Sequence, residues 1–299
     1  RALLHRRLHA AALLHAAEIY DTAKHGQQFG IRSGTLTYNY PSLKAWKDLA
    51  VERTGATEGK RLYENEGIKV IEGEAHFISS HEVTVNRRHL TAENFVIATG
   101  THSFIPSIEG LDKAGYVTFK EAVNLTRPPK SLFIVGAGSV GCEFAELFSI
   151  FGSKVYLADI TPRILSKEDE EVSELVRDTF ETERGMEVLT NAKVLRIAKE
   201  GLAKRVHFQQ GHSEKSVKVD EVLVATGKLA NVDIGLENAG VEYTPRGIQT
   251  NDFMQTTAKH IYAAGDVVGP YRYTHTAIYQ SRIVANNLLM AIYQHVTAP

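Results

Sequence analysis

A glycine-rich turn followed by an acid carries the clearest chemical signature in this 299-residue chain. The turn is Gly136-Ala137-Gly138-Ser139-Val140-Gly141, and Asp159 stands 18 residues after its last glycine, near the interval of about 20 for an acid that binds a ribose. The first glycine of such a turn permits the tight bend, the second lets a pyrophosphate approach, and the third lets helix and strand pack closely. The N–H groups of the helix start hold the phosphates. This pattern predicts a dinucleotide site.

The residues around the turn favour this interpretation over its alternative, an ordinary α/β turn with a helix-capping acid. Residues 131–135 predict a buried strand, and residues 154–158 predict the next one. Between them, residues 142–151 have helical spacing and end before Gly152. The apolar face of this helix would carry Phe144, Leu147, Phe148 and Phe151. The order strand, turn, helix, strand is the context that a dinucleotide fingerprint requires.

A second acid follows an apolar strand near the end of the chain. Residues 261–264 predict the strand, and Gly265 and Asp266 follow it directly. An acid at the carboxyl end of a strand suits the binding of a polyol or ribose hydroxyl, whereas a solvated turn acid would look the same in isolation. Apolar residues at helical spacing follow, as in a packing helix: Ile278, Ile283, Val284 and Leu288.

An internal repeat connects the two regions. Residues 66–100 and 184–227 each predict a short strand (66–71 and 184–189), two or three alternating strands, and a buried strand that ends in Ala-Thr-Gly. Two related nucleotide-binding domains are therefore expected. The corresponding turn of the first domain would fall near residue 9, yet no glycine precedes Gly26. We therefore expect the chain to begin partway into its first domain.

Composition limits the remaining classes of function. Thirty-four basic and 35 acidic residues leave a formal net charge of −1, which argues against a nucleic-acid or anionic membrane surface as partner. No apolar run approaches the roughly 18 residues of a membrane span. The single cysteine, Cys142, excludes a disulfide framework, a Cys-rich metal site and an internal redox pair. We expect a cytoplasmic protein of about two domains without a metal site.

The first residues are basic and contain no acid before Glu18. Such a segment is typical of a transit peptide or of an amphipathic helix. The helix is favoured because the apolar spacing continues through Tyr20. His5 and His9 stand four residues apart, but no carboxylate or cysteine joins them at ligand spacing, so exposed helix histidines are expected.

The motifs, in this order, resemble the pyridine nucleotide-disulfide oxidoreductases, flavoproteins that include dihydrolipoamide dehydrogenase, mercuric reductase and glutathione reductase. Residues 162–165 and 168–171 are most similar to the dihydrolipoamide dehydrogenase and mercuric reductase branch. The resemblance covers nearly the whole chain. Its four parts are the Ala-Thr-Gly of 98–100, the fingerprint of 136–143, the Ala-Thr-Gly of 225–227, and 264–266 followed by 273–277.

The resemblance implies an α/β fold with two related Rossmann-like FAD/NAD(P)-binding domains of three-layer ββα type, the first incomplete. Residues 1–118 would be a partial FAD-binding domain without its N-terminal βαβ unit, 119–243 the NAD-binding domain, and 244–299 the return segment of the FAD domain. A C-terminal dimerisation domain is expected to be absent. The family's redox disulfide would lie just before residue 1, and Arg1 would stand where the family commonly has lysine.

The resemblance also implies roles for individual residues. Ala75 would meet the adenine end of FAD, Asp266 the ribitol, and the backbone at Thr274 and His275 the flavin ring. Thr99, Gly100 and Gly265 join the cofactor-binding set. The NAD site would be lined by Gly136, Ala137, Gly138, Ser139, Val140, Gly141, Glu143, Asp159, Val194, Ala225, Thr226, Gly227 and Lys228.

Glu143 is the one catalytic residue that the resemblance implies. It would pair with the family lysine near the reactive flavin nitrogen and orient the nicotinamide face; here the partner is Arg1 or none. The alternative is a first-turn acid favoured by the helix dipole. Cys142 is interpreted as a small packing residue rather than a nucleophile.

The resemblance implies a flavoprotein oxidoreductase that transfers hydride between NAD(H) and FAD. In the parent protein, a homodimer, transfer would be coupled to a redox disulfide and a small-molecule or lipoyl-type disulfide substrate. The alternatives are a transhydrogenase or NADH oxidase of the same fold, and a non-catalytic redox sensor. We expect this chain alone not to reduce lipoamide, glutathione or mercuric ion, to bind FAD weakly or not at all, and to prefer NAD(H) over NADP(H).

Overall fold

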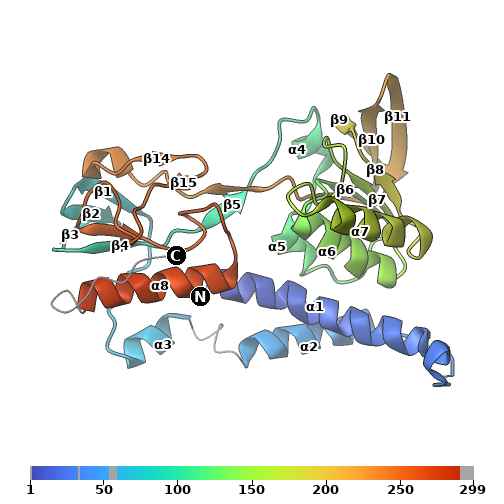
Figure 1. Cartoon of the computed structure of the whole chain (residues 1–299), viewed down its shortest axis with the longest axis horizontal. Coiled ribbons are helices and arrows are strands. Elements are labelled where there is room, and N and C mark those ends of the chain that lie inside the picture. The colour runs from blue at the N-terminus through green and yellow to red at the C-terminus, as the bar shows by residue number, and fades with distance from the viewer. Residues whose placement is uncertain (1, 33, 54–58, 290–299) are drawn as a thin grey trace. The chain divides into compact units, whose positions relative to one another are not determined.

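The structure is a computed structural model that describes residues 2–32, 34–53 and 59–289, and it is a mixed α/β protein (Figure 1). It divides into two compact units. The larger unit comprises His5–Thr57 and Ser103–Gly227, and the smaller unit comprises Arg1–Leu4, Glu58–His102 and Lys228–Pro299. The chain crosses between the units shortly after each Ala-Thr-Gly segment, at 102/103 and at 227/228.

These crossing points differ from the domain boundaries predicted at 118/119 and 243/244. Residues 5–57 also group with the larger unit, although they were assigned to the FAD domain. Compactness says nothing about which residues hold which cofactor. The assignment of 1–118, 119–243 and 244–299 to cofactor domains therefore stays a prediction.

A four-stranded parallel sheet forms the centre of the larger unit, in the order β12-β6-β7-β8. In the sheet register, Val135 pairs with both Val224 and Ala158. Gly136, Asp159 and Ala225 directly follow these residues, so all three lie at the carboxyl end of the sheet. The strands are β6 Ser131–Val135, β7 Lys154–Ala158, β8 Glu187–Leu189 and β12 Glu221–Val224.

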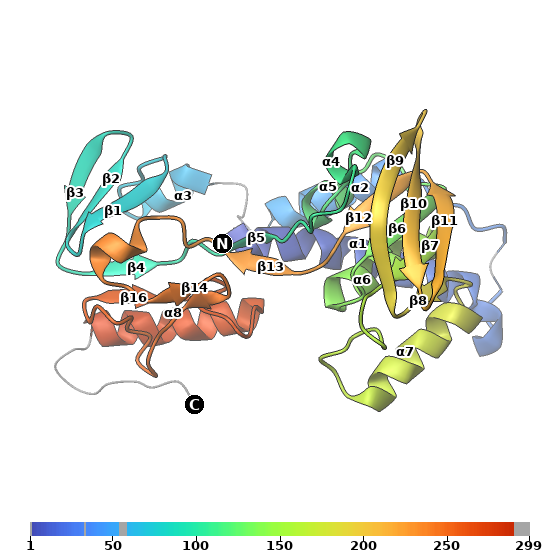
Figure 2. The same ribbon diagram turned by 90° about the horizontal axis from the view of Figure 1, so that it is seen from above.

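Alternate residues of these strands enter two separate cores. Leu132 and Ile134 pack with the helices α6 (Ser139–Ile150), α7 (Glu170–Thr182), α1 (Ala2–Lys24) and α2 (Tyr40–Glu52). Phe133 and Val135 pack instead with an antiparallel sheet on the opposite face (Figure 2). That sheet has the order β11-β10-β9 and contains Ala192–Glu200, Ala203–Gln210 and Ser213–Val219 as β9, β10 and β11. Because both faces are covered, each central strand is apolar after its first residue, which is polar in all four.

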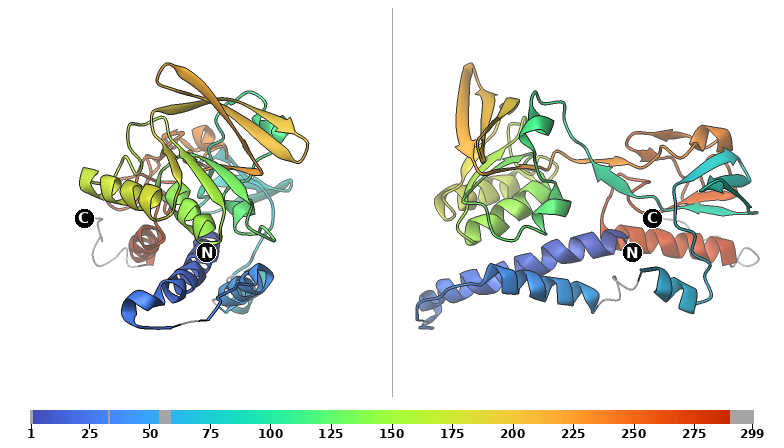
Figure 3. Two further views of the ribbon diagram at one scale, coloured as in Figure 1. Left: turned by 90° about the vertical axis from the view of Figure 1, so that its right-hand side faces the viewer. Right: turned by 180° about the vertical axis from the view of Figure 1, so that it is seen from behind.

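The smaller unit repeats this layering at reduced size. Its parallel pair is β4 (Phe95–Ile97) and β16 (Ile261–Ala263). Ile261 and Ala263 pack with Phe77 of the antiparallel sheet, whereas Tyr262 packs with Ile283 of helix α8. Helix α8 is the red helix of Figure 3. The sheet has the order β1-β2-β3, which are Ala75–Ser79, Glu82–Val85 and Arg88–Thr91, and α8 is Thr274–Leu289. The α/β fold class is confirmed, and the predicted repeat is confirmed except for its first short strand in the smaller unit.

Short elements connect the layers. In the smaller unit they are α3 Gly59–Asn65, β5 Thr101–Ser103 with its partner β13 Lys228–Ala230, η2 Leu236–Ala239, β14 Tyr243–Thr244 and β15 Gly247–Ile248. In the larger unit they are η1 Gly26–Phe29, α4 Leu111–Ala114 and α5 Phe119–Ala122.

The βαβ prediction holds in detail. Strands 131–135 and 154–158 are β6 and β7 as predicted. Helix α6 begins at Ser139, three residues earlier than its apolar spacing indicated, and Gly152 follows its end with a positive φ of 89°. The N-terminal helix is also confirmed as α1. In the part of the chain that the structure describes, no helix is long and apolar enough to cross a membrane.

Two predictions are wrong. Residues 66–71 form a turn and irregular backbone rather than a strand, because no described strand lies beside them as a hydrogen-bonding partner. His9 is not an exposed helix histidine: only 13% of its side chain is exposed, and its Nδ1 lies 3.9 Å from Asp48 Oδ1. The side chain of His5 lies outside the described residues.

Aromatic packing attaches the α1–α2 hairpin to the end of α6. The Tyr38 and Tyr40 rings lie 4.9 and 5.6 Å from the ring of Phe151. The Tyr38 hydroxyl donates to Phe151 O at 2.7 Å. The Tyr40 hydroxyl is buried and has no hydrogen-bond partner among the described residues, and this burial raises the pKa of Tyr40 to about 12.

These two hydroxyls predict opposite effects of one substitution. Tyr40→Phe removes an unsatisfied buried group and should leave the unfolding free energy unchanged or raise it by up to about 1 kcal/mol. Tyr38→Phe removes a hydrogen bond and should lower it by about 1 kcal/mol. Urea unfolding of both variants measures the difference. A Tyr40→Phe variant less stable than Tyr38→Phe would contradict the assignment.

Candidate functional site

The first glycine of the fingerprint is required by two features of the turn that leaves β6. Gly136 has a φ of +106°, a conformation that favours glycine. A Cβ at this position would lie 2.6 Å from Ala225 O. The segment after β12 therefore passes directly against the turn, and no side chain fits between them.

The other two glycines have different roles. A Cβ at Gly141 would lie 1.9 Å from Gly136 O, so helix α6 can lie this close to the turn only because residue 141 has no side chain. Gly138 is the N-cap of α6, and a Cβ there would meet no atom within 4 Å. Gly138 and Ser139 are both exposed. The fold thus requires Gly136 and Gly141, while Gly138 leaves open space above the first N–H groups of the helix, as a pyrophosphate needs.

Asp159 lies beside the same turn, directly after β7. Its Oδ2 accepts a hydrogen bond from Ala137 N at 2.7 Å, and its Oδ1 accepts from Thr161 N and Thr161 Oγ1 at 2.9 and 2.7 Å. The carboxylate therefore fixes the turn to the loop that follows β7. Two oxygens with about four lone-pair sites keep acceptor capacity for ribose hydroxyls.

The second Ala-Thr-Gly segment closes this site in the larger unit. Ala225 N donates to Val135 O at 2.8 Å. Gly227 O accepts from Phe104 N at 2.9 Å, and Thr226 Oγ1 donates to Phe104 O at 2.8 Å. The side chain of Val194, on β9, is buried in the core, so its backbone is the part available to a ligand.

The first Ala-Thr-Gly segment, in the smaller unit, has an equivalent partner in Asn231. Asn231 Nδ2 donates to Thr99 O at 2.7 Å, and Thr99 Oγ1 donates to Asn231 O at 2.8 Å. Asn231 N donates to Gly100 O at 2.9 Å. Asn231 is the fourth residue after Gly227, and Phe104 is the fourth after Gly100. Sequence reasoning missed both residues, although this equal offset within the repeat was a usable signal.

Asp266 is the other predicted acid, and it is 1% exposed. Its Oδ2 accepts from Thr101 Oγ1 at 3.3 Å and lies 3.5 Å from Lys228 Nζ. Its Oδ1 is buried and has no hydrogen-bond partner among the described residues. A buried carboxylate oxygen in this state fits a ligand hydroxyl. Lys228, predicted for the NAD site, lies beside Asp266 in the smaller unit, and its role in the NAD site stays a prediction.

The other residues predicted for FAD lie in the same unit. Gly265 N donates to Gln280 Oε1 of α8 at 2.8 Å, which fixes the turn before Asp266. Thr274 and His275 begin α8, and the His275 ring stacks on Tyr273 with the centroids 5.3 Å apart. Ala75 begins β1 and is exposed.

Glu143 and Cys142 point in different directions from the start of α6. Glu143 is exposed, and its predicted partner Arg1 lies outside the described residues. Cys142 is buried, and its thiol contacts Ala137 O at 3.5 Å. Burial, followed by the charges of Asp159 and Glu143, raises the pKa of the Cys142 thiol to about 12. This environment supports a packing role for Cys142.

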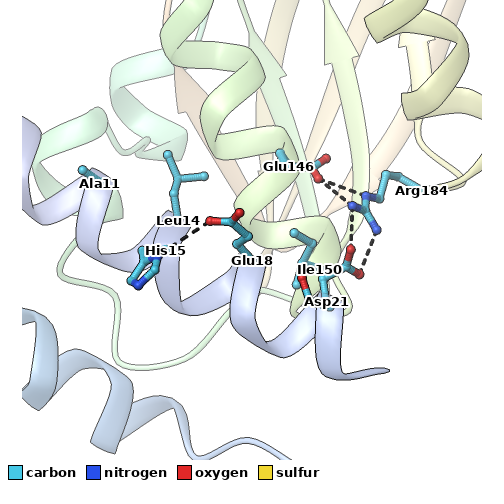
Figure 4. A pocket seen from close by; sticks show the side chains of 9 residues that line it. Ala11, Leu14, His15, Glu18, Asp21, Glu146, Ile150 and Arg184 are labelled. Atoms are coloured by element: carbon cyan, nitrogen blue, oxygen red, sulfur yellow. Dashed lines mark hydrogen bonds and ion pairs between the residues drawn. The ribbon is translucent and has the colours of Figure 1, made fainter. Parts of the chain in front are cut away.

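A cavity of about 470 Å³ lies elsewhere in the larger unit, between α1 and α6 (Figure 4). Arg184 bridges Asp21 and Glu146 across it, with both Asp21 oxygens at 2.9 Å and Glu146 Oε1 at 2.8 Å from the guanidinium. These carboxylates raise the pKa of Arg184, whereas its partial burial acts in the opposite direction. None of the predicted cofactor residues lines this cavity, and its ion pairs fasten α1 to α6. Among the described residues no group of three or more histidine, cysteine or acidic side chains forms a metal site.

Comparison with known proteins identifies the family. Residues 2–281 match the family described as pyridine nucleotide-disulphide oxidoreductase. The chain belongs to this family. Its oxidoreductase relatives include a Staphylococcus aureus mercuric reductase, 32% identical over 279 residues, and a Bacillus subtilis dihydrolipoyl dehydrogenase, 32% identical over 284 residues. The predicted family and its dihydrolipoamide dehydrogenase and mercuric reductase branch are thereby confirmed.

A solved structure gives the same fold. The Cu(II) complex of the HOCl-induced flavoprotein disulfide reductase RclA from Escherichia coli superposes with a TM-score of 0.82 at 26% identity, covering 97% of this chain and 62% of that chain. The curated relatives cover 93% and 92% of this chain. The chain spans 51% of the length of the mercuric reductase and 61% of the dihydrolipoyl dehydrogenase.

The pKa of Cys142 predicts an unreactive thiol. With a pKa of about 12, only about one molecule in ten thousand carries the thiolate at pH 8, and the thiolate is the reactive form. Ellman's reagent should therefore release no colour from the native chain and one equivalent after unfolding in urea. Stoichiometric reaction within minutes under native conditions would contradict the packing role.

The glycines predict separable effects on stability and binding. Gly141→Ala should lower the unfolding free energy by about 1–3 kcal/mol, because its Cβ would overlap the backbone of Gly136. Gly138→Ala should change it by less than about 0.5 kcal/mol but weaken binding of NADH. Urea unfolding and calorimetry test the pair. Equal destabilisation of both variants would refute the distinction.

Proposed function

We propose that this chain supplies the nicotinamide-dinucleotide site, and the ribitol contact of the FAD site, of an oxidoreductase that transfers hydride between NAD(H) and FAD. The observation that carries the proposal is the Gly136–Gly141 turn with Asp159 hydrogen-bonded to it. The unpartnered Asp266 Oδ1 in the smaller unit supports the flavin part.

In this proposal the chain's residues bind and orient the cofactors. The N–H groups at the start of α6 hold the pyrophosphate, and Asp159 accepts from the adenosine ribose. Asp266 accepts from a ribitol hydroxyl, and Lys228 at 3.5 Å stabilises its negative charge. The nicotinamide and flavin themselves supply the hydride chemistry when bound. Glu143, exposed beside the fingerprint, is proposed to orient the nicotinamide.

The remaining assignments rest on the family and its named members. We propose a small-molecule or lipoyl-type disulfide as the final substrate, a homodimer as the assembly, and the cytoplasm as the location. Neither a nucleic acid nor a membrane is proposed as a partner, because the net charge is −1. A transhydrogenase or NADH oxidase remains the alternative within the fold. Both use the same dinucleotide and flavin contacts.

The charge at the end of β7 favours NAD(H) over NADP(H). A carboxylate accepts hydrogen bonds from free 2′- and 3′-hydroxyls, but it repels a 2′-phosphate. NADP sites need arginines there to bind the phosphate. The residue directly after Asp159 is Ile160, which is 73% exposed, and the nearest arginine is Arg163, beyond Pro162.

We therefore predict that the chain binds NADH at least about tenfold more tightly than NADPH, a difference of about 1.4 kcal/mol. Isothermal titration calorimetry with both ligands measures it. Asp159→Asn keeps a side-chain oxygen as acceptor but removes the charge, so it should reduce the preference. Equal affinities in the wild type, or tighter binding of NADPH, would refute the assignment; no binding of NADH at all would refute the proposed function.

A further inference from the structure

Arg163 is a cationic side chain that the internal contacts do not account for. It is partly buried, and its Nη1 is buried without a hydrogen-bond partner among the described residues. Arg184, Arg205 and Arg177, in contrast, all pair with carboxylates. An unsatisfied buried donor on a charged group is costly, so a position that keeps one is a candidate for contact with an anionic ligand.

The backbone of Arg163 is fixed beside the glycine-rich turn on both sides. Thr161 N donates to Asp159 Oδ1 at 2.9 Å, and Thr161 Oγ1 lies 2.8 Å from Arg163 O. Two residues after Arg163, Leu165 N donates to Ala137 O at 2.8 Å. Ala137 N in turn donates to Asp159 Oδ2. The loop that carries Arg163 is thus hydrogen-bonded to the same two residues, Ala137 and Asp159, that shape the dinucleotide site.

The chemistry of the guanidinium selects among the parts of a dinucleotide. It has five N–H donors and no acceptor, and it matches phosphate oxygens in charge and geometry. The ribose hydroxyls can donate hydrogen bonds to the carboxylate of Asp159, which leaves the phosphates as partners for the guanidinium. A dinucleotide offers phosphate in two places, the pyrophosphate and, in NADP(H), the 2′-phosphate. The charge of Asp159 disfavours the second.

We propose that Arg163 is a further binding residue that donates a charge-assisted hydrogen bond to a phosphate group of the dinucleotide, and that this group is the pyrophosphate. The inference rests on the proposed function, because it requires the nucleotide to bind at the Gly136–Gly141 turn. This contact would add a side chain to the pyrophosphate-binding part of the site, which otherwise consists of the backbone N–H groups at the start of α6. Both cofactor forms carry the pyrophosphate, so the contact strengthens binding of either.

The test compares Arg163→Gln with two matched variants. Arg163→Lys keeps the charge without the fork-shaped donor, and Arg177→Gln removes an arginine of α7 that pairs with Glu181 at 3.3 Å. Calorimetry with NADH, ADP and 2′,5′-ADP gives the affinities, and the thermal midpoint checks folding. Arg163→Gln should weaken NADH and ADP at least about tenfold, as for a lost hydrogen bond to a charged group. Arg163→Lys should recover part of the loss, and Arg177→Gln should bind as the wild type does.

Each other outcome overturns a stated part. If the wild type binds NADH and Arg163→Gln binds it within about twofold, the phosphate contact is wrong while the proposed function stands. If Arg163→Gln weakens only 2′,5′-ADP, the contacted group is the 2′-phosphate and the pyrophosphate assignment is wrong. If the wild type binds no NADH, the proposed function fails and the inference fails with it. An equal loss in Arg177→Gln would show a general charge effect rather than a contact.

Discussion

The approach of helix α6 to the turn after β6 is the constraint on which the rest of the larger unit depends. A Cβ at Gly141 would lie only 1.9 Å from Gly136 O, so the helix can start at this distance from the sheet only because both positions lack side chains. This contact brings the first N–H groups of α6 to the sheet edge. The parallel register brings the ends of β6, β7 and β12 to the same edge. The start of α6, Asp159 and the second Ala-Thr-Gly segment thereby meet in one place.

The same residues stabilise the fold and shape the site. Asp159 joins the turn to the loop after β7 through Ala137 and Thr161. A ligand that binds this carboxylate would therefore bind a residue that also holds the turn in place. In the smaller unit, Asp266 is held by Thr101 and lies beside Lys228, yet it keeps one buried oxygen available. The two acids differ in this respect. Both Asp159 oxygens accept hydrogen bonds from the protein, whereas Asp266 Oδ1 is buried and has no hydrogen-bond partner among the described residues.

Local patterns in the sequence predicted most of the fold and the centre of the site. The β6-α6-β7 unit and the repeat follow from apolar periodicity and glycine spacing, which act over a few residues. The segment 66–71 was predicted wrongly because a strand also needs a partner strand beside it, and periodicity does not reveal whether one is there. His9 was wrongly predicted to be exposed, because its neighbour Asp48 lies on another helix, α2, and the spacing within α1 does not reveal that contact. Asn231 binds Thr99 across 132 positions, and the unpartnered Nη1 of Arg163 depends on tertiary packing. The Asn231 contact could be found only by comparing offsets between the two repeats, and the state of Arg163 Nη1 has no signature in the sequence.

Amide hydrogen–deuterium exchange of the chain with and without NADH tests the central claim most directly, because it reports where the ligand acts. The account predicts that saturating NADH slows exchange at the start of α6 (Ser139–Ile150) and in the loop 159–165. Peptides from the β1-β2-β3 sheet of the smaller unit should keep their rates. Binding of NADH that leaves the α6 start and the loop unchanged, or that protects only the smaller unit, would contradict the assignment of the Gly136–Gly141 turn as the dinucleotide site.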